Sequence, residues 1–157
     1  MPSRYRSSRL NRRHVLAGAA GAVITAALHP AQAAAGDLAV AMAAYTKGAP
    51  VRAGKVKLDV AELVDNGNVV PITVTADSPM TAADHVKSIA VFNEKNPQRD
   101  VARFTLGPRA GKADVTTRIR LATSQQLVAV AQMSDGSYWS HTVNVIVTLA
   151  ACIEGDP

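Results

Sequence analysis

The chain has 157 residues, of which 48% are hydrophobic, and its 17 Lys and Arg exceed its 12 Asp and Glu to give a net charge of +5. Five of those basic residues and none of the acidic ones lie in residues 1–33, so the rest of the chain balances at 12 against 12. The positive charge therefore belongs to the first 33 residues and is no evidence for a nucleic-acid partner. One cysteine excludes an intramolecular disulfide, and with four scattered histidines it predicts no metal site.

The first 33 residues have the pattern of an export signal. A basic segment containing Arg12 and Arg13 is followed by a mild apolar run over 17–28 and by small residues at 31–33, after which we predict cleavage. The run is too short to serve as a membrane anchor. An arginine pair followed by x-Val-Leu is typical of twin-arginine signals, so we predict Arg12 and Arg13 as recognition residues and the periplasm as the destination. The alternative is an N-terminal amphipathic helix of the mature domain.

After the leader, an Ala-rich stretch over 38–47 predicts a short helix that ends at Gly48-Ala49-Pro50. From there the apolar residues alternate with polar ones, which indicates β-strands. Pro71 predicts an edge strand or a bulge, because proline cannot donate a hydrogen bond to a neighbouring strand. The pattern predicts seven strands, near residues 56–60, 70–74, 86–93, 101–106, 115–119, 127–133 and 138–149.

Seven short strands separated by turn signals such as Asp65-Asn66-Gly67-Asn68, with no long helical pattern, predict an all-β fold, an antiparallel β-sandwich. The expected organisation is a signal peptide over 1–33, a β-sandwich domain over 34–149 and a C-terminal arm over 150–157. This arm carries the lone Cys152. A thiol so close to a chain end is a buried bystander, an intermolecular link or a reactive group that reaches outward.

The sequence contains no nucleophile elbow, zincin motif, phosphate loop or C-x-x-C, so the chain by itself does not look like an enzyme. His141 falls on the apolar face of the last predicted strand, where we expect a hydrogen-bonded core histidine, and His85 lies in a polar segment. A run of basic residues is expected to form a solvated face, with an anion or partner patch as the alternative. These residues are Arg99, Arg103, Arg109, Lys112, Arg118 and Arg120.

Three segments, 85–97, 104–108 and 133–139, resemble the sulfur-carrier subunit SoxY of the bacterial thiosulfate-oxidising Sox system. The resemblance covers about residues 55–152 and extends to the twin-arginine leader and the late lone cysteine. It implies an immunoglobulin-like sandwich that forms a heterodimer with a small SoxZ-like β-protein. It also implies that Cys152 holds a covalent sulfur adduct, with no other cofactor, while separate periplasmic sulfur-oxidation enzymes of the Sox system process it.

The sequence departs from the family at the cysteine itself. The family typically ends in a Gly-Gly-Cys-Gly-Gly arm, whereas Ala150-Ala151 precede Cys152 here and Ile153 follows it. These residues restrict the backbone, so we expect a stiff arm that places the thiol roughly 10 Å beyond a strand ending near Leu149. A scaffold subunit with an inert thiol, in which Cys152 would continue the last strand, is the alternative function. An oxidoreductase is the least supported one, because the chain has no resolving cysteine.

Overall fold

The structure is a computed structural model that describes the backbone of residues 30–151 and the side chains from residue 36 onward. Arg12, Arg13 and Cys152 lie outside the described residues. The chain enters the described part in the helix α1 (Pro30–Thr46), which is longer than predicted and runs through the predicted cleavage position. It ends where the sequence predicted, because Lys47 and Gly48 adopt left-handed φ angles of 55° and 77°.

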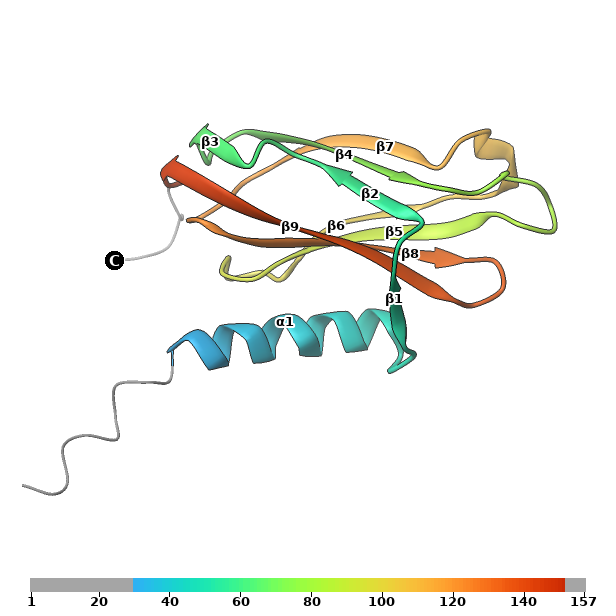
Figure 1. Ribbon diagram of the computed structural model, residues 1–157, viewed down its shortest axis with the longest axis horizontal. Helices are drawn as coiled ribbons and strands as arrows, with labels where there is room; N and C mark the ends of the chain where they lie inside the picture. The colour runs from blue at the N-terminus through green and yellow to red at the C-terminus, as the bar shows by residue number, and fades with distance from the viewer. Residues whose placement is uncertain (1–29, 152–157) are drawn as a thin grey trace, which may run out of the picture. The chain divides into compact units, whose positions relative to one another are not determined.

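The described strands form two sheets, which confirms the predicted β-sandwich (Figure 1). The larger sheet has the order β1-β9-β8-β5-β6, with β3 also paired to β9, and the smaller sheet has the order β2-β4-β7. Seven strands match the predicted ones, and two short strands, β1 and β3, were not predicted. The bounds are β1 (Val51–Ala53), β2 (Val56–Asp59), β3 (Leu63–Asn66), β4 (Val70–Ala76), β5 (Val86–Asn93), β6 (Asp100–Thr105), β7 (Asp114–Ile119), β8 (Gln125–Met133) and β9 (Tyr138–Leu149).

Strand β9 joins the distant parts of the chain. It pairs antiparallel with β8 along most of its length. On its other edge it pairs in parallel with β1 at its start, where Val51 lies opposite Tyr138. It pairs in parallel with β3 at its end, where Leu63 lies opposite Ile146. The two strands that the sequence did not predict therefore cover the outer edge of β9 at both ends.

Pro71 lies on β4, which is the central strand of the smaller sheet, so the prediction of an edge strand is wrong. Its partner on β7 is Arg118. The pairing of β2 with β4 covers only Thr73–Ala76, so β2 provides no partner for Pro71 on its side. This one-sided pairing explains how a residue without an N–H is accommodated in a central strand.

Two apolar layers hold the domain together. Between the sheets, Ile72 and Val74 of β4 pack in one buried cluster with Ile89 of β5 and Leu127 of β8. On the opposite face of the larger sheet, Leu38 of α1 packs in a second cluster. The β-residues of that second cluster are Ala90, Phe92, Val128, Val130 and Tyr138. Strands β5 and β8 are thus buried on both faces, which accounts for their nearly continuous apolar sequence.

Candidate functional site

The last described residues are held by backbone hydrogen bonds at the end of β9. The strand stops at Leu149, as predicted, and the Ala151 N–H donates to the carbonyl of Leu121 at 3.1 Å. The Gly67 N–H donates to the Leu149 carbonyl and the Leu121 N–H to the Gly67 carbonyl, both at 2.8 Å. We call these four residues the backbone clamp. The clamp matters because Cys152 is bonded directly to Ala151.

Close packing at Gly67 makes the clamp possible. A Cβ atom built on Gly67 would lie 2.3 Å from the Leu121 carbonyl oxygen and 3.0 Å from the Ala151 nitrogen. Gly67 is not among the glycines with positive φ, so glycine is required here for space and not for a left-handed backbone. Three segments far apart in sequence therefore meet at one residue that has no side chain.

The clamp shortens the predicted arm. Ala151 is only 8% exposed, so the packed part of the chain extends at least to residue 151, which the prediction assigned to the arm. The backbone is therefore held in place up to Ala151, the residue to which Cys152 is bonded. Ala150 and Ala151 do not continue β9, whereas the scaffold alternative required the strand to extend to Cys152.

Exposed apolar side chains gather near the clamp. Of the five large hydrophobic residues that are strongly exposed in the described part of the chain, four lie on β3, on the turn after it or on the end of β9. Leu63 and Ile146 are opposite each other in the β3–β9 register. Leu149 accepts a hydrogen bond from Gly67, and Val69 follows Gly67 by two residues. We call Leu63, Val69, Ile146 and Leu149 the apolar rim; Leu63 and Ile146 share a face as paired residues, whereas Leu149, three residues along β9, points to the other face.

The two histidines lie away from the clamp. His141 is exposed, so the prediction of a core histidine is wrong; its Nδ1 accepts a hydrogen bond from the Leu58 N–H at 3.1 Å and so links β9 to β2. It precedes Leu149 by eight residues on one strand, a distance of about 27 Å. His85 lies next to Ser134, whose hydroxyl oxygen accepts the His85 N–H at 3.1 Å. Each of these hydrogen bonds joins two segments of the sandwich that are far apart in sequence.

The basic residues lie mostly on the exposed surface, as expected for a solvated face. Arg99 pairs with Asp37 of α1 at 3.1 Å, and Arg103 pairs with Asp100 at 2.6 Å. The guanidinium of Arg103 also lies 5.0 Å from the ring centre of Tyr45. This group borders an open hollow of about 490 Å³ between the end of α1 and strands β5 and β6. Burial raises the pKa of Tyr45, although a hydrogen bond to Ser88 opposes that shift.

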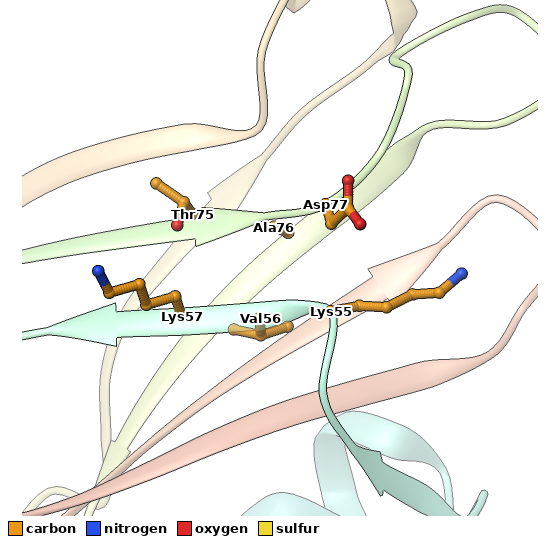
Figure 2. Close-up of a pocket in the computed structure, with 6 residues that line it drawn as sticks. All are labelled: Lys55, Val56, Lys57, Thr75, Ala76 and Asp77. Atoms are coloured by element: carbon orange, nitrogen blue, oxygen red, sulfur yellow. The ribbon is translucent and has the colours of Figure 1, made fainter.

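A second hollow, of about 290 Å³, lies where the start of β2 meets the end of β4, and Figure 2 shows six of its residues. Lys55 and Lys57 point in opposite directions along the strand (Figure 2). The charged groups do not converge on one point, so this hollow has no catalytic arrangement. Among residues 30–151, no three His, Cys, Asp or Glu side chains are grouped as metal ligands. Within the same residues, no helix is long and apolar enough to span a membrane.

The fold and the clamp define a class of protein: a two-sheet sandwich whose single cysteine follows directly on an anchored chain end. The model of the family described as "Sulfur oxidation protein SoxY" matches residues 41–152, a range that includes both the clamp and Cys152. The chain therefore belongs to the SoxY family. Family membership supports a sulfur-carrier role.

Solved structures agree with this assignment. The sulfur carrier protein SoxY from Chlorobium limicola f thiosulfatophilum is 31% identical, with a TM-score of 0.61, and the match covers 73% of this chain and 99% of that one. A superoxide reductase (neelaredoxin) from Ignicoccus hospitalis is 21% identical, with a TM-score of 0.53, and the match covers 60% of this chain and 80% of that one. This second likeness concerns the fold alone. No curated protein matches the sequence.

Proposed function

We propose that this protein is a periplasmic sulfur carrier that holds sulfur intermediates covalently on Cys152 during the oxidation of thiosulfate or other reduced sulfur compounds. The observation that carries the proposal is a family match that extends to the chain's one cysteine, at position 152. The clamp supports it, because a cysteine bonded to an anchored residue at the end of a domain is offered at a defined place on the surface.

Thiol chemistry suits a carrier. A cysteine thiolate forms S–S bonds that later exchange with other sulfur nucleophiles, which a serine or threonine oxygen cannot do. Joining the thiolate to the terminal sulfur of thiosulfate forms one S–S bond and releases two electrons. A separate redox enzyme must accept those electrons, so the carrier is a substrate of its partner enzymes and is not itself the catalyst.

The partners we propose are a small SoxZ-like β-protein, which forms a heterodimer with this chain, and the periplasmic sulfur-oxidation enzymes of the Sox system. Two surfaces support a protein partner. The apolar rim is one, and the edges of β6 and β7 are the other, since each of these strands pairs on one side only among the described strands. A stable heterodimer would bury roughly 1,200–2,000 Å² in total. Neither a nucleic-acid partner nor a membrane anchor is part of the proposal.

The proposal predicts a removable mass on Cys152. Protein purified from its own host during growth on a reduced sulfur compound should carry added sulfur mass, as measured by intact-mass spectrometry. A thiol reductant should remove that mass, because it cleaves S–S bonds. Cys152→Ser is the matched control: it changes one atom, should never carry the adduct, and should not support sulfur-dependent turnover in a reconstituted system.

Two results together would overturn the carrier function. One is wild-type protein that carries no adduct under any sulfur-oxidising growth condition. The other is a Cys152→Ser variant that supports turnover as well as the wild type does. The chain would then act as a scaffold subunit with an inert thiol.

A further inference from the structure

The backbone clamp brings together a turn, a loop and the chain end. Gly67 follows β3, Leu121 lies two residues after β7, and Ala151 lies two residues after β9. Each adjacent pair in the series Leu149, Gly67, Leu121 and Ala151 is joined by a backbone hydrogen bond of 2.8–3.1 Å. The same junction buries the side chain of Ala151, which is 8% exposed, while Leu149 is 60% exposed.

We propose that Gly67 is a positioning residue for the carrier cysteine: by letting Leu121 reach the Ala151 amide, it fixes the point at which Cys152 leaves the domain. The role assigned to Gly67 rests on the proposed function, whereas the contacts that Gly67 makes do not depend on it. The Cβ of any side chain at position 67 would lie 2.3 Å from the Leu121 carbonyl oxygen and 3.0 Å from the Ala151 nitrogen, so the backbone at this junction would have to move apart.

The clamp limits how far a sulfur group bound to Cys152 can extend from the domain. It therefore limits which partner active sites can accept that group. With Ala151 fixed, the backbone between the domain and the cargo is one residue long, about 3.8 Å between Cα atoms. A partner enzyme must bring its reacting centre close to the surface of this domain. Its entrance must also accommodate Leu149, which belongs to both the clamp and the apolar rim and is 60% exposed.

A spin label tests the clamp directly. Because the chain has one cysteine, a nitroxide thiol reagent attaches to Cys152 alone in the mature protein. We expect a predominantly slow component in its continuous-wave EPR spectrum. Gly67→Ala should at least double the fast component. Gly107→Ala is the matched control and should leave the spectrum unchanged, because nothing lies within 4 Å of a Cβ there and the φ of −156° suits alanine.

If Gly67→Ala folds poorly, a second pair of variants still tests the clamp. Ala151→Pro removes the N–H that donates to Leu121, beyond the last strand, so the sandwich should remain folded by circular dichroism. It should raise the fast component as Gly67→Ala does. Ala150→Pro places the same ring on an exposed neighbour and should retain the slow spectrum.

The proposal is overturned if the wild-type label is already as mobile as the label on Ala151→Pro, or if Gly67→Ala and Gly107→Ala give the same spectrum. The outcome is independent of the carrier function, since the mass of the sulfur adduct is measured separately. A wild-type protein with a slow label and no adduct, together with a Cys152→Ser variant that supports full turnover, would keep the clamp and reject the carrier. An adduct on a protein whose label is fully mobile would support the carrier function and overturn the clamp.

Discussion

Tyr45 fastens the end of α1 to the larger sheet. Its hydroxyl lies 2.7 Å from the Ser88 hydroxyl on β5, and its ring stacks at an angle against Phe92 and Tyr138, with centroid distances of 5.7 and 5.8 Å. Burial is the main cause that raises its pKa above 10.0, and the hydrogen bond with Ser88 acts in the opposite direction. A phenol that stays protonated in the folded state supports folding only while the unfolded phenol is protonated as well.

We therefore predict that the free energy of unfolding falls as the pH rises above 10 and that Tyr45→Phe removes part of this fall. At pH 7 the same variant should lose about 1 kcal/mol, the usual net value of one hydrogen bond. Urea unfolding at pH 7 and between pH 9 and 11 measures both effects. Ser88→Ala is the control: it removes the hydrogen bond but leaves the phenol buried, so it should keep the alkaline fall. An identical alkaline fall in Tyr45→Phe and wild type would contradict the assignment.

At the scale of single residues, sequence patterns singled out residues of interest better than they predicted what surrounds each side chain. Cys152 could be singled out by its position near the chain end, and the family model includes it. Gly67 was assigned to a turn because Asn-Gly is a turn signal, but its contact with Leu121 and Ala151 joins segments that no local pattern connects. By the alternation along β9, His141 belongs to the inner face of the sheet. Its side chain is nevertheless exposed, and its ring accepts a hydrogen bond from the backbone N–H of Leu58 on β2.

At the scale of elements, α1 is attached by one face. Leu38 is 7% exposed and packs in the cluster with Phe92 and Tyr138, whereas Val40, two residues further along, is 69% exposed. Leu38→Ala should lower the free energy of unfolding by about 2–3 kcal/mol, because it removes buried apolar volume. Val40→Ala, the control on the same helix, should change it by less than about 0.5 kcal/mol. Urea titrations of both variants measure the difference, and equal losses would show that α1 does not pack through Leu38.

The predicted elements were accurate where the apolar alternation was long. They failed where a short strand forms only because it pairs with a strand far away in the sequence. Strands β5, β8 and β9 each have eight or more residues and were located to within two residues at each end. Strand β1 has three residues, with no period to detect, and exists because β9 supplies a partner. The tetrapeptide from Asp65 to Asn68 combines the end of β3 with a turn, so a turn signal concealed a strand.

At the scale of the whole molecule, the predicted leader would decide the compartment, and its arginine pair lies outside the described residues. If the twin-arginine route exports the protein, changing Arg12 and Arg13 together to lysine should leave the precursor in the cytoplasm, because that route requires the arginine pair and not only its charge. Cell fractionation followed by immunoblotting measures the distribution. Changing Arg4 and Arg9 to lysine is the matched control and should leave export unaffected. Normal export of the Arg12→Lys, Arg13→Lys variant would exclude this route.

The pairings of β9 also determine when the domain can fold. Strand β9 is the last described strand, yet it supplies the neighbours of β1, β3 and β8, including the pairing of residue 51 with residue 138. Contacts between residues so far apart in sequence form slowly, and none of these can form before the last strand has been synthesised. The larger sheet therefore cannot form completely while the chain is still being synthesised. If residues 1–33 are an export signal, that signal is synthesised long before β9, so transport of the folded domain would have to wait until the last strand is made.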